Sequence, residues 1–91
     1  MEFRRSESVT FEVIDQRAVL LDPDGVELIT LNPVGTLVWE LLEPPRAPEA
    51  IVAGLVDRFP DVPVDALRAD VDHFLSDLSA RGLVSGNDAG G

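Results

Sequence analysis

Residues 28–42, LITLNPVGTLVWELL, pass from one hydrophobic period to another, and this junction constrains the fold more than any other stretch. Residues 26–31 suit a β-strand, in which side chains alternate between two faces. Asn32 is a preferred helix N-cap, and Pro33 loses no hydrogen bond in the first turn of a helix. From there the apolar residues follow a helical period of about 3.6, with Trp39 beside the stripe of Val34, Leu37, Val38, Leu41 and Leu42. The sequence therefore predicts a strand joined directly to a helix.

Two further strands are predicted before this junction. Residues 9–14, VTFEVI, alternate as a half-buried strand does, and residues 18–22, AVLLD, are more continuously apolar. Residues 15–17 form a short turn. DPDG at 22–25 is the strongest turn signal in the chain, because Pro and Gly suit the special backbone angles of a hairpin. Short turns between consecutive strands predict an antiparallel meander of three strands.

Two further helices are predicted after the junction. Pro48 can open a second helix that Pro60 ends, and a third helix is expected over about residues 64–81. Gly82 suits the left-handed position that follows a helix. Leu83 is then placed for the hydrophobic contact of a Schellman motif.

The predicted fold class is therefore α+β, with a three-stranded antiparallel meander followed by three helices (βββααα). The last two helices and the hairpin resemble a winged helix-turn-helix. We expect a flexible N-terminal arm over residues 1–8, a folded domain over residues 9–84 and a disordered tail over residues 85–91.

The composition excludes several classes of protein and partner. The 91 residues suffice for one small domain with one core. Seventeen acidic residues against seven arginines give a net charge of −10, which would repel nucleic acid. There is no cysteine for a disulfide or a thiolate metal site. The N-terminus lacks the apolar stretch of a signal peptide and no run approaches a membrane span, so we expect a cytoplasmic protein without a membrane partner.

The sequence nominates no catalytic or metal-binding site. His73 is the only histidine, and no nucleophile or second ligand stands at a spacing that would give it a catalytic or metal-binding role. The glycines form no phosphate-cradling motif. Gly35 and Gly54 interrupt helical patterns at a cost of about 1 kcal/mol each, which close helix packing would explain. We therefore expect no enzymatic activity, no cofactor and no metal.

The helix-turn-helix pattern leaves a DNA-binding regulator open as an alternative. The third helix would be the recognition helix. Its two basic residues, Arg68 and Arg81, are outnumbered by four aspartates: Asp65, Asp70, Asp72 and Asp77. A helix that reads DNA usually presents Arg, Lys, Asn or Gln to phosphates and base edges. The charge of this helix therefore disfavours DNA.

The strand at 26–31 is a second functional lead, because the last strand of a meander is an edge. Edge strands expose unpaired N–H and C=O groups, which proteins usually protect with charge, proline or bulges. Only Glu27 offers such protection here. An apolar edge beside an amphipathic helix can accept a peptide by β-strand addition. A helix, the N-terminal arm or a second copy of the chain could cover the edge instead, which leaves open a monomer or an edge-mediated dimer.

The order of several motifs resembles that of the PqqD family, whose members are small leader-peptide-binding domains, also called RiPP recognition elements. The resemblance covers about residues 9–84 and rests on Leu31-Asn32, Gly35, Trp39 with Leu41-Leu42, Asp70-Val71 followed by Phe74-Leu75, and Gly82-Leu83. It implies a non-catalytic, winged-helix-like domain that binds the leader of a ribosomally made precursor peptide. Such a domain presents the precursor to a processing enzyme.

The form LNPVGTLVWELL is most similar to the stand-alone members of lasso-peptide clusters, which hand the leader to a separate peptidase. The alternative is a peptide chaperone for a radical SAM enzyme, as in the pyrroloquinoline-quinone pathway. Members of that branch tend to lack a tryptophan at the position of Trp39. The third strand departs from the family, because members often carry aromatic residues where this chain has Leu28 and Ile29.

The resemblance implies that the leader lies antiparallel along the third strand and packs against the third helix. The strand residues concerned are Val26, Glu27, Leu28, Ile29, Thr30 and Leu31. Four residues on adjoining turns of the third helix are candidates for the other wall: Leu67, Asp70, Val71 and Phe74. Asp70 could pair with a basic leader residue, whereas Val71 and Phe74 suit an ordinary core equally well. Alternation predicts that Ile29 and Leu31 face the core and that Leu28 lies nearer the opposite face.

Overall fold

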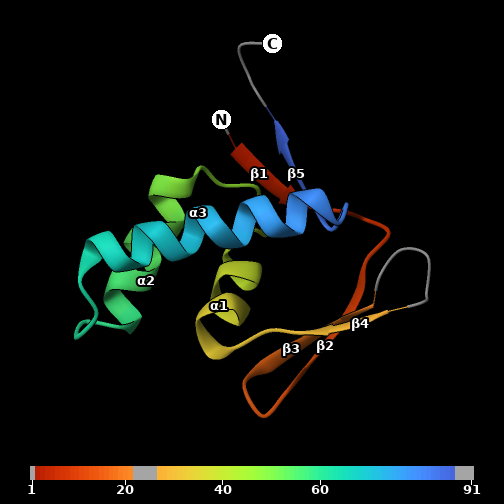
Figure 1. The fold of residues 1–91 in the computed structure, drawn as a ribbon, viewed down its shortest axis with the longest axis horizontal. Helices are drawn as coiled ribbons and strands as arrows, with labels where there is room; N and C mark the ends of the chain where they lie inside the picture. The colour runs from red at the N-terminus through yellow and green to blue at the C-terminus, as the bar shows by residue number, and fades with distance from the viewer. Residues whose placement is uncertain (1, 22–26, 88–91) are drawn as a thin grey trace.

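The computed structural model describes residues 2–21 and 27–87, and its elements follow the predicted order with two added strands, one before and one after it (Figure 1). The elements are β1 (Glu2–Arg5), β2 (Thr10–Ile14), β3 (Arg17–Leu21), β4 (Leu28–Thr30), α1 (Pro33–Leu41), α2 (Pro48–Arg58), α3 (Val64–Ala80) and β5 (Val84–Asn87). β2, β3 and β4 form a three-stranded antiparallel sheet, and the three helices follow it. This confirms the predicted α+β class. The predicted turn at 22–25 lies outside the described residues.

The three-stranded sheet has the order β2-β3-β4, so β3 is its central strand. Asp15 and Gln16 form the β2–β3 turn with positive φ angles of 52° and 67°, the backbone of a two-residue type I′ hairpin. Ala18 and Leu20 of β3 are fully buried, whereas every residue of β2 is exposed. The sheet therefore packs on the helices through β3, and β2 and β4 are its edges.

The side chains of Asn32 and Thr36 hold the junction between β4 and α1. Asn32 caps α1, and its Oδ1 accepts a hydrogen bond from the Gly35 amide at 2.7 Å. The buried Thr36 Oγ1 accepts one from the Ala18 amide at 2.8 Å, which ties the first turn of α1 to the central strand. The Leu31 amide continues the ladder by donating to the Ala18 carbonyl at 2.8 Å. The predicted helix cap is confirmed.

The hydrophobic core lies between β3 and the three helices, and the fully buried Trp39 is its largest side chain. The other large, fully buried side chains include Leu20, Leu42, Ile51, Leu55, Leu67, Val71 and Leu78. All three helices contribute to this set, so the core depends on their packing rather than on any one helix.

The end of α3 has the predicted Schellman geometry. Gly82 has a φ of +78°, which a residue with a side chain rarely adopts. The Gly82 amide donates to the Ser79 carbonyl at 3.1 Å. The Leu83 amide donates to the Leu78 carbonyl at 3.0 Å. These two hydrogen bonds define the motif, and they direct the chain from α3 into β5.

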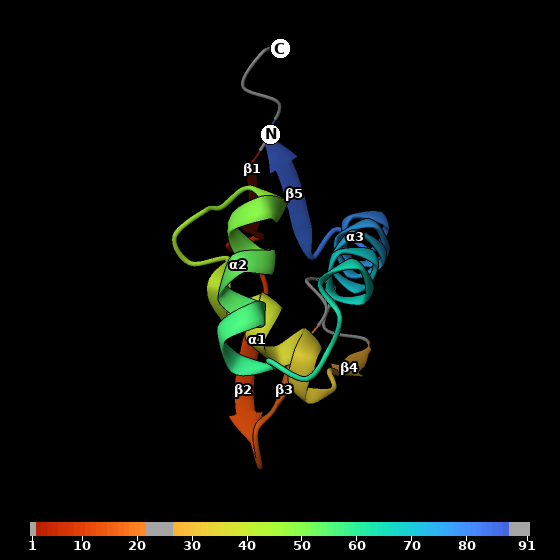
Figure 2. The same ribbon diagram turned by 90° about the vertical axis from the view of Figure 1, so that its left-hand side faces the viewer.

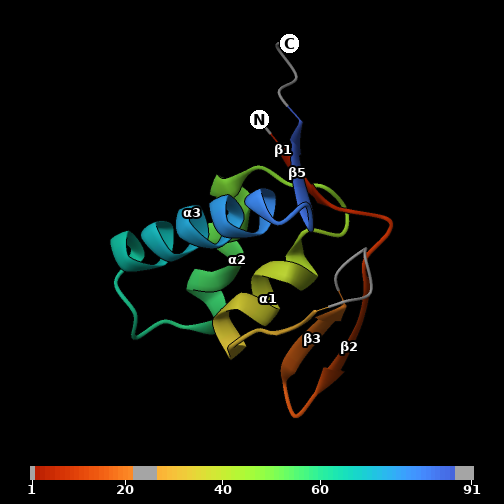
Figure 3. The same cartoon turned by 45° about the vertical axis from the view of Figure 1, so that its right-hand side comes forward.

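β1 and β5 form a second, two-stranded sheet at the opposite end of the molecule from the β2–β3 hairpin (Figures 1 and 3). The two strands pair antiparallel along their whole length. On its other side β1 exchanges two backbone hydrogen bonds between Phe3 and Arg46, at 2.8 and 3.1 Å. The sequence predicts a flexible arm over residues 1–8 and a disordered tail over 85–91. The structure differs, because parts of both segments form this sheet.

Arg5 gives the physical reason that β1 is fixed. Its Nε donates to the Trp39 carbonyl at 3.0 Å, in the last turn of α1, where carbonyl groups lack helical partners. Its guanidinium lies 4.9 Å from the centre of the Phe11 ring and 5.3 Å from that of Trp39. One arginine thus joins β1 to α1 and β2. These contacts are distant in sequence, and no local pattern indicates them.

Candidate functional site

β4 is an edge strand of the sheet within the described residues. The Leu31 amide donates to Ala18 on the β3 side, and neighbouring residues of an antiparallel strand point their N–H and C=O groups to alternate sides. The amides and carbonyls of Leu28 and Thr30 therefore point away from β3. They form a short row of donors and acceptors with which a further strand could pair. Val26, also predicted for this edge, lies outside the described residues.

The side chains of β4 follow the predicted alternation. Leu31 is 6% exposed and Ile29 packs partly buried against the core, whereas Leu28 is 67% exposed. Glu27 and Thr30 are also exposed. One face of the strand therefore belongs to the core, and the face with Leu28 is open to contact.

A groove of about 230 Å³ lies between α1 and α3. Figure 2 shows α3 nearly end-on, with α1 and β4 below it. The N-cap and first turns of α1 contribute Asn32, Val34, Gly35 and Val38. The facing turns of α3 contribute Asp70, His73, Phe74 and Asp77. The structure thus places Asp70 and Phe74, two of the predicted wall residues, in this groove.

Leu67 and Val71, the other two predicted wall residues, are each 0% exposed. They lie one helical turn apart, on the face of α3 that packs into the core with Leu75 and Leu78. Their assignment to the wall is therefore corrected: they are core residues. A docked peptide could meet them only through the side chains that cover them.

Phe74 approaches α1 closely because residue 35 is glycine. A Cβ atom on Gly35 would lie 2.9 Å from Phe74 Cε2 and 3.1 Å from Asn32 Oδ1, closer than such atoms normally come. A Cβ atom on Gly54 would lie 2.9 Å from Leu41 Cδ1. The prediction that these two glycines permit close helix packing is confirmed. Gly35 also sets the position of an aromatic ring in the groove.

Ion pairs join the start of β4 to the end of α3. Arg81 Nη1 lies 3.1 Å from Glu27 Oε1, and Arg81 Nε lies 3.5 Å from Asp77 Oδ2. All three side chains are substantially exposed, so these pairs add little to stability. They do connect the edge strand to the helix beside it, at the end of the groove where β4 begins.

The sequence did not reveal His73, Asp77 or Arg81 as residues of this region. Helical spacing carried a signal for the first two, because they lie one and two turns after Asp70 on the same side of α3. No such signal exists for Arg81, which meets Glu27 across 54 positions in sequence. Only the fold brings these two side chains together.

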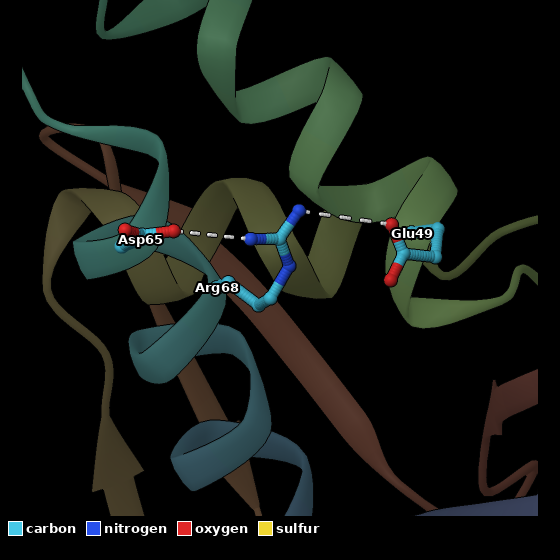
Figure 4. Close-up of polar contacts among 3 residues, drawn as sticks. All are labelled: Glu49, Asp65 and Arg68. Atoms are coloured by element: carbon cyan, nitrogen blue, oxygen red, sulfur yellow. Dashed lines mark hydrogen bonds and ion pairs between the residues drawn. The ribbon is translucent and has the colours of Figure 1, made fainter.

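The arginines of α3 are engaged by carboxylates. Arg68 Nη1 lies 3.3 Å from Asp65 Oδ1, and Arg68 Nη2 lies 3.9 Å from Glu49 Oε2 on α2 (Figure 4). Arg81, the C-cap residue of α3, makes the two ion pairs described above with Glu27 and Asp77. Within α3, four aspartates stand against the single arginine Arg68, and this negative charge counts against a helix that reads DNA phosphates and bases.

Neither a metal-binding cluster nor a membrane-spanning helix is found in the described residues. Across residues 2–21 and 27–87, His, Cys, Asp and Glu side chains nowhere gather in threes in a way that could hold a metal ion. None of the helices in these ranges combines the length and the apolar character needed to cross a membrane.

The fold is similar to that of a solved structure, and the sequence matches a known protein family. The chain is 30% identical to TbiB1 in a solved structure of TbiB1 in complex with the TbiA(beta) leader peptide. The TM-score is 0.81, over 92% of this chain and 96% of that chain. No curated protein matches the sequence. Residues 17–84 match the family described as coenzyme PQQ synthesis protein D (PqqD), and since this match spans well over half of the sequence, the chain belongs to the PqqD family.

Proposed function

We propose that this protein binds the leader of a ribosomally made precursor peptide by β-strand addition and presents it to a processing enzyme, without catalysing a reaction itself. One observation carries the proposal: β4 has an open backbone edge, and Glu27 at its start pairs with Arg81 at the end of α3, the helix that walls the groove. TbiB1, which shares this fold, is described in complex with a leader peptide, and this supports the same role here.

A leader lying antiparallel to β4 would pair with the outward backbone groups of Leu28 and Thr30. Its side chains would point alternately toward solvent and toward α3, where Phe74 offers an apolar surface and Asp70 a negative charge. The backbone pairs would set the register, and the groove would supply the specificity. Because a flexible peptide loses entropy on docking, we expect a binding free energy of about −8 kcal/mol or somewhat better.

Titration of a fluorescently labelled leader, taken from the precursor encoded beside this gene, tests the proposal. We expect saturable binding with a Kd of about 1 µM or lower. Light scattering on the free protein and on the complex would distinguish a monomer from a dimer formed through the β4 edge, because a leader that takes this edge would dissociate the dimer. A leader that fails to bind at about 50 µM would contradict the proposed function.

We infer that Asp70 contributes to specificity by pairing with a basic leader residue. Asp70→Asn should weaken the binding of such a leader by about twofold to fivefold, which is the usual contribution of a partly exposed ion pair. The loss should shrink at high salt, because mobile ions screen exposed charges. Asp72→Asn is the matched control, since Asp72 is exposed on the same helix and does not line the groove. Equal affinities of the two variants would remove Asp70 from the site.

For the partner enzyme we favour a leader peptidase of a lasso-peptide cluster, on the strength of the motif LNPVGTLVWELL. The alternative is a radical SAM enzyme that receives its peptide from this domain. Pull-down of each candidate enzyme encoded beside this gene, with and without the leader, distinguishes the two. Capture of the radical enzyme alone would reject the peptidase.

A further inference from the structure

A larger hollow is lined by residues of β1, of β5 and of the end of α3. Its volume is about 780 Å³, within the range of about 300–1,000 Å³ that is typical of ligand sites. Its polar lining consists of two arginines, four serines and one carboxylate: Arg4, Arg5, Ser6, Ser8, Ser79, Ser85 and Glu7. The hollow therefore offers hydroxyl groups and one more positive than negative side chain, unlike the groove with its two aspartates.

Arg4 is the cation that this hollow can offer to a ligand. Arg5 is already held by the Trp39 carbonyl and two aromatic rings. Arg4 Nη2 lies 3.8 Å from Glu7 Oε1, and the two side chains are 52% and 90% exposed. An ion pair so long and so exposed contributes little, so a carboxylate of a ligand can replace Glu7. On a chain with a net charge of −10, such a hollow is a place where an acidic segment is attracted rather than repelled.

The β4 edge leads toward this hollow. A peptide antiparallel to β4 has its C-terminal end beside the start of the strand, where Glu27 stands. Arg81 reaches from Glu27 to the end of α3, and its neighbours Ser79 and Gly82 line the hollow. An extended chain advances about 3.3 Å per residue, so the residues that follow the docked strand can continue past Arg81 toward the hollow.

We propose that the hollow binds the part of the precursor that directly follows the docked strand, through an acidic side chain that pairs with Arg4 and polar groups that meet the serine hydroxyls. This inference rests on the proposed function and deepens it, because the protein then holds two consecutive segments of one peptide. The second contact benefits from the high effective concentration that the first creates. It also fixes the direction in which the remainder of the precursor leaves the domain.

Two synthetic peptides from the precursor encoded beside this gene test the inference. The short peptide covers the segment that docks on β4, and the long peptide adds the next eight or so residues, about 26 Å of extended chain. The wild-type protein should bind the long peptide at least about threefold more tightly. Arg4→Glu should abolish this difference and leave the affinity of the short peptide unchanged. Arg17→Glu, the same charge change at the distant β2–β3 hairpin, should preserve the difference.

Other results would overturn the inference in distinct ways. Equal affinities of the two peptides for the wild-type protein, or an equal loss for both peptides in Arg4→Glu and Arg17→Glu, would show that the hollow does not hold the peptide. Unchanged peptide binding combined with loss of capture of the processing enzyme would assign the hollow to that enzyme instead. If neither peptide bound the wild-type protein, the proposed function would fail, and this inference with it. Circular dichroism melts would establish that both variants are folded.

Discussion

Replacing Leu28 with proline is expected to weaken leader binding by at least about tenfold while the domain keeps its fold. The Leu28 amide points away from β3, so the substitution removes no hydrogen bond of the sheet. It removes the donor offered to an incoming strand, and the pyrrolidine ring takes up space where that strand would lie. The lost hydrogen bond alone costs about 0.5–1.5 kcal/mol, and the steric exclusion adds to that cost.

Two other substitutions separate the backbone from the side chain. Leu28→Val keeps the amide and should retain most of the affinity. Ile29→Pro removes an amide that faces β3, so it should lower the melting temperature rather than act on binding alone. Fluorescence anisotropy gives the affinities, and circular dichroism melts show which variants fold. Full affinity in a folded Leu28→Pro protein would direct attention to β2, the other edge of the sheet.

Trp39→Ala should lower the free energy of unfolding by about 3–5 kcal/mol, the usual cost of truncating a fully buried tryptophan. Trp39 is 0% exposed, and its ring meets Phe11 edge-on with the ring centres 5.5 Å apart. Truncation also removes the ring against which the Arg5 guanidinium lies. The cation–π contact that helps to fix β1 is then lost as well. For a domain of this size the melting temperature should fall by about 15 °C or more, measured by calorimetry.

Trp39→Phe provides a more specific test of the same site. Within the described residues no acceptor meets the buried Trp39 Nε1, and an unpaired buried donor costs about 1–3 kcal/mol. Phenylalanine loses some volume but removes this donor, so its stability loss should be less than half of that for Trp39→Ala. Val56→Ala, an exposed position on α2, should change stability by less than about 0.5 kcal/mol. Equal losses of stability for the alanine and phenylalanine variants at position 39 would show that the buried aromatic ring does not account for the stability that Trp39 contributes.

The parts of the fold that were predicted correctly are encoded by neighbouring residues. Asn32 caps α1 through the Gly35 amide three positions away, and Pro48 opens α2 as expected. Gly82 ends α3 through carbonyls within five residues. Each of these signals needs only local geometry, and none depends on how the elements pack.

The parts that were missed depend on contacts between distant residues. β1 and β5 are short and polar, and they pair because the core brings the two ends of the chain together and Arg5 anchors one of them. The candidate site shows the same limit. Helical periodicity showed which residues of α3 share a face, but it could not show that Asp70 and Phe74 would line the groove while Val71 would turn into the core.

The pairing of β1 with β5 has a practical consequence for handling this domain. Residues 2 and 87 stand opposite each other in the register, so both described ends leave the molecule on the same side, far from the β2–β3 hairpin (Figure 1). An affinity tag or a fused enzyme on either terminus would therefore sit near Arg4 and not over Leu28. Surface attachment through either end would leave the exposed strand accessible, while a bulky fusion would crowd the serine-lined hollow.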